Sequence, residues 1–168
     1  MKEYVSVDVE TTGLAPKQDK IIEIGAVRVR DGQIVESFTS FVNPGRILPA
    51  YITELTGILQ EQVDEAETME SVLPAFLEFA GDLPLMGHRI LFDYGFLKRA
   101  AVNMRLDFER SGVDTLKLSR QFLSELPSRR LSALCEHFEI PIQAHRALED
   151  ARATHILYEK LLELYGTD

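Results

Sequence analysis

Two carboxylates stand close together near the start of the chain, in the stretch VSVDVETTGL at residues 5–14. Residues two apart on a strand point to the same face, so Asp8 and Glu10 share a face with Ser6. Repulsion and desolvation both oppose this arrangement unless a positive charge lies between the acids. Because carboxylate oxygens are the ligands that Mg²⁺ and Mn²⁺ prefer, the pair indicates a divalent-metal site at the end of a strand.

The elements around this pair predict a mixed α/β fold. Residues 4–10 and the two halves of residues 20–44 have strand-like patterns, and Asp31-Gly32-Gln33 between those halves is a hairpin signal, which predicts a three-strand antiparallel meander. After Pro49 the pattern becomes mainly helical, over residues 49–58, 69–81, 93–104, 128–140 and 148–166. A short apolar strand is expected at residues 83–88, and residues 112–123 are expected to run from a strand into a helix. A mixed sheet with helices packed on it follows.

Composition limits the class of protein. The 168 residues are 45% hydrophobic and 27% charged, which is typical of one soluble globular domain spanning residues 1–168. No secretory leader and no membrane-spanning stretch is expected. The single cysteine, Cys135, excludes an internal disulfide and favours a reducing, cytoplasmic location. A net charge of −9 argues against broad electrostatic wrapping of nucleic acid, but not against a small acidic site filled by cations.

Several polar residues have an ordinary structural interpretation when each is taken alone. Asp93 could cap the helix that follows it, and Asp150 falls in the first turn of the last helix, where acids favour the helix dipole. His145 alone would be a loop histidine. Ser128 is expected to cap the helix of residues 128–140, and Asp114 the helix that follows it.

Three motifs together identify a family resemblance. They are VDVETTGL at residues 7–14, GHRILFDYGFL at 87–97 and HRALEDARAT at 145–154. Their order and spacing resemble those of the DEDDh, or DnaQ-like, 3′–5′ exonucleases, the family that includes the exonuclease domain of the bacterial DNA polymerase III epsilon subunit. The connecting segments also resemble that family, so the similarity covers nearly the whole chain and implies a ribonuclease H-like fold.

The resemblance implies a set of catalytic residues. Asp8, Glu10, Asp93 and Asp150 correspond to the metal-binding carboxylates, and His145 to the histidine of the third motif. The implied cofactors are two divalent metal ions, Mg²⁺ or Mn²⁺, which share Asp8 and relieve the repulsion within DVE. His145, with an ordinary pKa near 6.5, would accept the proton of the attacking water. The implied reaction releases nucleoside 5′-monophosphates from a 3′ end.

Substrate contacts are implied at a second set of positions: Thr11, Thr12, Gly13, Leu14, Leu55, Ile58, His88 and Arg89. The backbone near Thr11 and Thr12 would meet the terminal 3′-OH, and Leu14 would wedge against the terminal base. Leu55 and Ile58 would form the opposite wall, although core packing explains them nearly as well. Arg89 stands where many relatives have asparagine; it would either bind a substrate phosphate or point into solvent.

Three functions remain open from the sequence. The first is a 3′–5′ exonuclease on single-stranded DNA, with a DNA polymerase as a possible partner. Because little sequence follows the last motif, a free-standing nuclease is expected rather than a subunit with a polymerase-binding extension. The second is an exoribonuclease acting on short RNA oligomers or RNA 3′ ends, since net charge does not distinguish DNA from RNA. The third is a silent binding module, which would be free to lose the five catalytic residues retained here.

Overall fold

A computed structural model of the chain describes residues 1–143 and 146–166. It contains a five-stranded sheet in the order β3-β2-β1-β4-β5, in which β1, β2 and β3 are antiparallel and β4 and β5 run parallel to β1. The strands are β1 (Glu3–Thr11), β2 (Ile21–Arg30), β3 (Gln33–Phe41), β4 (Leu85–Gly87) and β5 (Gly112–Asp114). The expected mixed sheet with an antiparallel meander is therefore confirmed.

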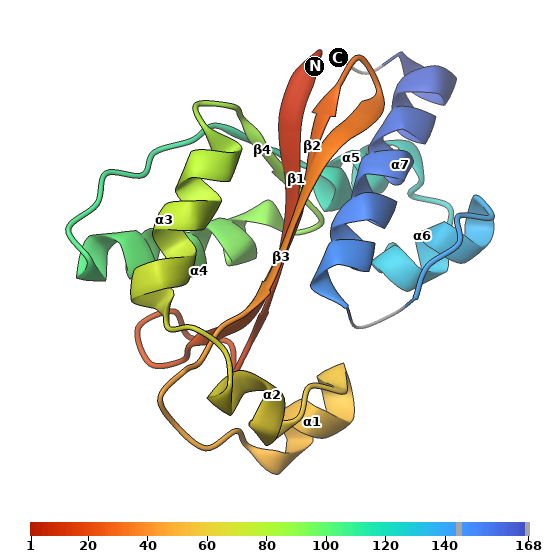
Figure 1. Ribbon diagram of the computed structural model, residues 1–168. Coiled ribbons are helices and arrows are strands. Elements are labelled where there is room, and N and C mark those ends of the chain that lie inside the picture. The colour runs from red at the N-terminus through yellow and green to blue at the C-terminus, as the bar shows by residue number, and fades with distance from the viewer. Residues whose placement is uncertain (144–145, 167–168) are drawn as a thin grey trace.

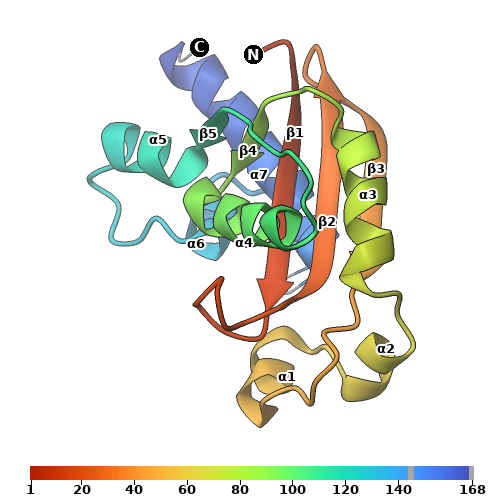
Figure 2. The same cartoon turned by 90° about the vertical axis from the view of Figure 1, so that its left-hand side faces the viewer.

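Helices cover both faces of this sheet (Figures 1 and 2). They are α1 (Ala50–Thr56), α2 (Gln60–Asp64), α3 (Met69–Ala80), α4 (Ile90–Asn103), α5 (Thr115–Phe122), α6 (Leu131–His137) and α7 (Ala147–Tyr165). Figure 2 shows α3 and α4 in front of the sheet and α7 behind it, while α1 and α2 lie beyond one end of the strands. In the described part of the chain, no helix has both the length and the apolar character that a membrane span needs.

The two faces of β1 have different roles. Val5, Val7 and Val9 are buried in the main apolar cluster, together with side chains of α3 and α4 such as Phe76 and Leu97. On the opposite face, Ser6 is fully buried and its hydroxyl donates a 2.7 Å hydrogen bond to the carbonyl of Ala151 in α7. The alternation expected from the sequence therefore places the acids of β1 on the face that α7 covers.

Local signals set most element boundaries. Asp31 and Gly32 both have positive φ, 51° and 78°, as the two central residues of a tight hairpin turn require, and Gln33 already begins β3. Gly57 ends α1 in the left-handed conformation. Asp114 caps α5 by accepting a 2.9 Å hydrogen bond from the Leu116 amide.

The structure differs from the sequence predictions at three places. The sequence reading missed α2, whose five residues are too few to produce a clear periodic pattern. Helix α4 begins at Ile90, so Asp93 lies inside its first turn and is not its cap. Helix α6 begins at Leu131 with Arg130 at the cap position, and the Ser128 hydroxyl accepts only from the Arg130 amide, at 3.3 Å, before the helix starts.

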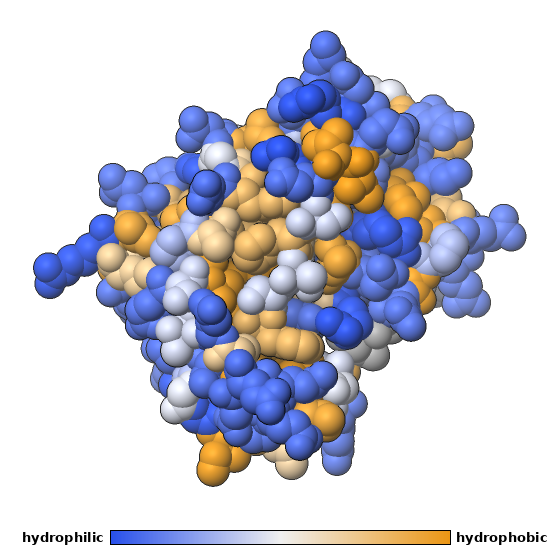
Figure 3. Space-filling view, viewed as in Figure 1, coloured by the Kyte–Doolittle hydropathy of each residue, from blue (hydrophilic) through white to orange (hydrophobic). Residues whose placement is uncertain are grey.

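One side of the molecule exposes the edge of the sheet. Strand β3 is the outer strand, and Ile34 and Val35 on it are 38% and 47% exposed. Figure 3 shows this side, where hydrophilic side chains surround a central area of apolar and weakly polar ones. The acidic residues of β1 are separated from this edge by β2.

Candidate active site

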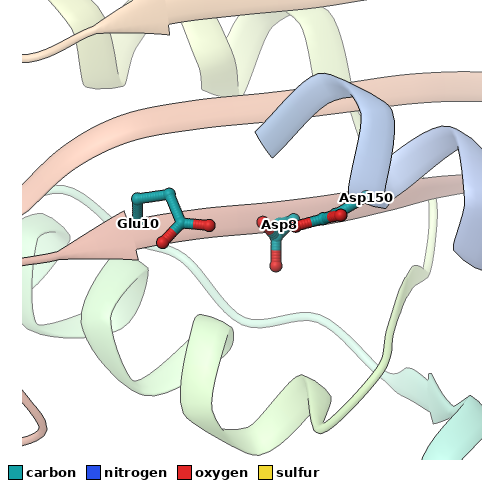
Figure 4. Close-up of side chains that lie close together, drawn as sticks. All are labelled: Asp8, Glu10 and Asp150. Carbon is teal, nitrogen blue, oxygen red and sulfur yellow. The ribbon is translucent and has the colours of Figure 1, made fainter. Parts of the chain in front are cut away.

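Three carboxylates converge at the carboxyl-terminal half of β1. Asp8 and Glu10 extend from the strand, and Asp150 comes from the first turn of α7 (Figure 4). Each offers an oxygen, and these oxygens all lie within 4.8 Å of one another. Residues 140 positions apart in the sequence thus form one acidic group.

The close approach of α7 to the sheet brings Asp150 to this group. Gly25 on β2 lies directly opposite Asp8 in the antiparallel register. A Cβ atom built at Gly25 would lie 2.1 Å from the Leu148 nitrogen and 2.3 Å from the Ala147 carbonyl carbon. Only glycine leaves room for the helix backbone here, so this position sets how near Asp150 comes to β1.

Asp93 approaches β1 from its other neighbour, α4. Its side chain is 3% exposed, and its Oδ1 accepts a 3.0 Å hydrogen bond from the Val9 amide. Asp93 lies outside the three-carboxylate group. Its charge is nevertheless, after burial, the largest cause of the raised pKa of Asp8. Asp93 is thus held between Asp8 and Glu10 along the strand by a bond to the intervening residue.

Burial and mutual repulsion disfavour the charged forms of these acids. Burial, followed by the charges of Asp93, Glu10 and Asp150, raises the pKa of Asp8 well above its ordinary value. Burial and then Asp150 and Glu23 raise the pKa of Glu10 to about 8. Burial and then Glu23 raise the pKa of Asp150 to about 6. Around neutral pH the group therefore retains protons that a cation would displace.

The donor set fits a hard divalent cation. The Oδ2 atom of Asp8 is buried and has no hydrogen-bond partner among the described residues, which is costly for a carboxylate oxygen unless a cation binds there. Among the described residues the group consists of oxygen ligands alone, as Mg²⁺ and Mn²⁺ prefer, without the cysteine or histidine ligands of a structural zinc site. Asp8, Glu10 and Asp150 are the residues that would hold a metal.

The loop after β1 is internally bonded. The Thr11 hydroxyl donates to the Gly13 carbonyl at 2.6 Å, and the Thr12 hydroxyl accepts from the Lys20 amide at 2.9 Å. A Cβ atom at Gly13 would lie 2.4 Å from a carboxylate oxygen of Asp19. These contacts fix the loop backbone while leaving the next residue, Leu14, 79% exposed.

The two residues expected to face Leu14 differ in their burial. Leu55 on α1 is 59% exposed and free to contact a ligand. Ile58 is only 1% exposed and packs in an apolar cluster with Ile22 and Ile52, so core packing, the alternative weighed for it from the sequence, explains this residue. The sequence reading also missed Tyr51 on α1, whose hydroxyl donates to the Thr12 carbonyl at 3.3 Å and ties α1 to the loop.

His88 and Arg89 diverge although they are adjacent. The Nε2 of His88 lies 2.8 Å from the Arg129 carbonyl, and its Nδ1 lies 2.8 Å from the Thr115 hydroxyl. Both ring nitrogens are therefore hydrogen-bonded within the protein. A direct contact with substrate would require one of these bonds to break. Since a carbonyl only accepts, Nε2 donates, and burial lowers the pKa of the ring. Arg89 is exposed, has a left-handed backbone with φ 75°, and holds its guanidinium 5.1 Å from the Phe92 ring centroid.

Two more acidic or basic residues, His145 and Glu23, bear on the predicted site. His145, expected as the general base, lies outside the described residues. Glu23, which the sequence reading overlooked, is 1% exposed on β2 and stands opposite Glu10 in the register. A lone acid inside the apolar run IIEIGAV was the signal that could have revealed it.

This fold and acidic group define a class, the ribonuclease H-like exonucleases. The exonuclease family model matches residues 5–158, which is most of the chain. The chain belongs to this family and is a 3′–5′ exonuclease of the DEDDh type. The fold expected from the three motifs is confirmed.

Similar proteins agree with this assignment. A "DNA polymerase III PolC-type" from Caldanaerobacter subterraneus subsp. tengcongensis is 44% identical over 162 residues, which are 96% of this chain but 12% of that protein. The chain thus spans about one-eighth of the length of such relatives. Among solved structures, "Exonuclease X in complex with 5' overhanging duplex DNA" has a TM-score of 0.79 at 26% identity, over 98% of this chain and 94% of that one. The nuclease domain of 3'hExo bound to rAMP has a TM-score of 0.80 at 22% identity, covers 96% and 92% of the two chains, and shows the fold alone.

Proposed function

We propose that this chain hydrolyses phosphodiester bonds from the 3′ end of single-stranded DNA and releases nucleoside 5′-monophosphates with the help of two divalent metal ions. The observation that carries the proposal is the convergence of Asp8, Glu10 and Asp150 within 4.8 Å, with a buried Asp8 oxygen that has no partner in the described chain. A silent binding module would have no need to keep so costly an arrangement.

Asp8, Glu10 and Asp150 would hold the metal ions, with Asp93 supporting the set from α4. When bound, divalent ions supply Lewis-acid chemistry that favours deprotonation of water and offsets negative charge at the scissile phosphate. Mg²⁺ and Mn²⁺ both suit an all-oxygen donor set.

The protein's own residues would orient the substrate and move the proton. His145 is the proposed general base, since an ordinary imidazole exchanges a proton near neutral pH. The backbone of Thr11 and Thr12, fixed by the bonds of the loop, would position the terminal 3′-OH. The exposed Leu14 and Leu55 side chains would contact the terminal base. Gly13 would support this loop conformation, because its missing side chain leaves room for the Asp19 carboxylate.

DNA is the proposed substrate because the similar curated proteins are DNA polymerases and a similar solved structure holds duplex DNA. The same comparisons support a DNA polymerase as a partner in proofreading. The acidic protein, at −9, suits a single-stranded end better than a long duplex, which would need extended basic contacts.

The decisive test is a digestion of three 5′-labelled substrates with Mn²⁺ or Mg²⁺: single-stranded DNA, a matched RNA and a very short RNA oligomer. A descending ladder on DNA, with mononucleotide 5′-phosphates as product, is expected. Asp8→Asn is the control and should remove cleavage of every substrate while the protein stays folded. Preference for either RNA would replace the DNA proposal with an exoribonuclease. Cleavage that survives Asp8→Asn would contradict the metal role of that residue.

A further inference from the structure

Glu23 is a buried acid whose hydrogen-bond partners, within the described part of the chain, belong to the start of α7. Its Oε2 accepts from the Arg146 side chain, from Nε at 3.2 Å and from Nη2 at 3.1 Å. Its Oε1 accepts from the backbone amide of Ala147 at 3.1 Å. One carboxylate on the central part of the sheet therefore binds both the residue before α7 and the first residue of that helix.

The same helix end makes a second contact on β2, two residues further along. Glu23 stands opposite Glu10, and Gly25 stands opposite Asp8. In an antiparallel sheet, opposite residues face the same side, so Glu23 and Gly25 flank the acids of β1 on the face that α7 covers. The backbone of Ala147 and Leu148 packs directly on Gly25.

Asp150 follows this attachment by less than one helical turn. Its amide donates a 3.0 Å hydrogen bond to the carbonyl of Arg146, whose side chain Glu23 holds. The Arg146 guanidinium is also 5.3 Å from the Phe41 ring centroid, a second contact that restricts this side chain. The path from Glu23 to the Asp150 carboxylate is therefore short and consists of hydrogen bonds and rigid helix backbone.

We propose that Glu23, through its bonds to Arg146 and Ala147, is a positioning residue that fixes Asp150 in the geometry required for metal binding. The inference rests on the proposed function, because it assigns Asp150 to the metal site. Glu23 does not need to touch the metal or the substrate: both of its carboxylate oxygens are occupied by the start of α7.

A purely electrostatic role makes a different prediction. The charge of Glu23 raises the pKa of both Glu10 and Asp150, so the charge alone would also draw a cation to the site. Removal of Glu23 would weaken metal binding under either explanation. Removal of the Arg146 charge distinguishes the two explanations. If the role is electrostatic, losing this positive charge should strengthen metal binding. If the bond positions Asp150, losing it should weaken metal binding.

The variants are Glu23→Gln, Arg146→Gln and the pair combined. Gln at position 23 keeps the shape and an oxygen for the Ala147 amide but loses the charge that holds Arg146. Arg146 has a side chain 51% exposed, so its replacement should leave a folded protein. Glu36→Gln is the matched control: it removes one negative charge from the 2.7 Å ion pair with Arg28 on the same hairpin, away from the acids.

The readouts are the Mn²⁺ dissociation constant, from free Mn²⁺ counted by electron paramagnetic resonance, the thermal midpoint, and kcat and KM at saturating Mn²⁺. We expect each single variant to weaken Mn²⁺ binding about tenfold or more, as is usual when a group that orients a metal ligand is lost. The combined variant should bind Mn²⁺ no more weakly than the weaker-binding of the two single variants, because both substitutions remove the same bond. Glu36→Gln should bind Mn²⁺ like the wild type.

Tighter Mn²⁺ binding by Arg146→Gln would overturn the positioning role and leave electrostatics. Unchanged Mn²⁺ binding with a lower thermal midpoint would overturn it in favour of a purely structural ion pair. The proposed function fails separately: if the wild type binds Mn²⁺ but cleaves none of the three substrates, the nuclease assignment falls while the Mn²⁺ series still decides the role of Glu23.

Discussion

Gly25→Ala offers a sharp test of how closely α7 must approach β1. The added Cβ would lie 2.1 Å from the Leu148 nitrogen and 2.6 Å from its Cα, whereas ordinary contacts begin near 3.4 Å. The obstruction is helix backbone, which cannot rotate aside as a side chain can. The start of α7 must therefore retreat by about 1 Å, and Asp150 retreats with it.

The retreat should lower both the rate of cleavage and the stability of the protein. A displacement of about 1 Å at a catalytic group costs on the order of 100-fold in rate, and overpacking costs about 1–3 kcal/mol in the free energy of unfolding. The assay is a single-turnover cleavage of 5′-labelled DNA at saturating Mn²⁺, measured well below the thermal midpoint so that only folded protein is compared.

Gly95→Ala on α4 is the matched control. A Cβ atom there would meet only the Pro16 ring, at 3.7 Å, and alanine favours a helix over glycine by roughly 0.5–1 kcal/mol. This variant should be as active as the wild type and slightly more stable. A Gly25→Ala protein that keeps a rate within about threefold of the wild type would refute the claim that the packing of α7 on Gly25 sets the site.

Three further predictions concern the acids and the proposed substrate contacts. Because the pKa of Glu10 rises from 4.5 to about 8 and that of Asp150 from 3.8 to about 6, these two carboxyls bind more protons in the native metal-free protein than in the unfolded chain between about pH 4 and 8. Their contribution to the free energy of unfolding should therefore be fully present below about pH 4 and be lost as the pH rises toward 8; Mn²⁺ should offset this loss, and a rise in the thermal midpoint on adding Mn²⁺ that does not grow with pH would contradict the repulsion. Leu14→Ala should raise KM for DNA with little change in the thermal midpoint, since that side chain is 79% exposed; an unchanged KM would remove Leu14 from the substrate site. Arg89→Asn should be at least as stable as the wild type, because asparagine tolerates φ 75° better than arginine, and a ratio of DNA to RNA cleavage that does not change would exclude Arg89 as a specificity residue.

The amino-acid sequence and its three motifs predicted the fold class and four acids: Asp8, Glu10, Asp93 and Asp150. Alternation along β1 settles which residues share a face, because the side-chain period of a strand is two and one face must be buried. Asp8 and Glu10 were therefore assignable to one face from residues 5–14 alone. The spacing of the three motifs added Asp93 and Asp150, and Asp31-Gly32 marked the hairpin because few residue pairs adopt two positive φ values.

The tertiary structure decided everything that depends on contacts between distant segments. Ile58 and Leu55 are similar apolar residues three positions apart, and only packing against Ile22 buries one while leaving the other exposed. His88 lies in a motif, yet its ring nitrogens bind Thr115 and Arg129, which local sequence does not reveal.

Glu23 shows the physical reason most clearly. Its burial is tolerable only because Arg146 and the Ala147 amide, more than 120 positions away in the sequence, satisfy both of its oxygens. A single sequence shows an acid within an apolar strand but not the partner that makes it possible. The residues of this site are therefore visible in the sequence, whereas the contacts that hold α7 against the sheet are set only by the fold.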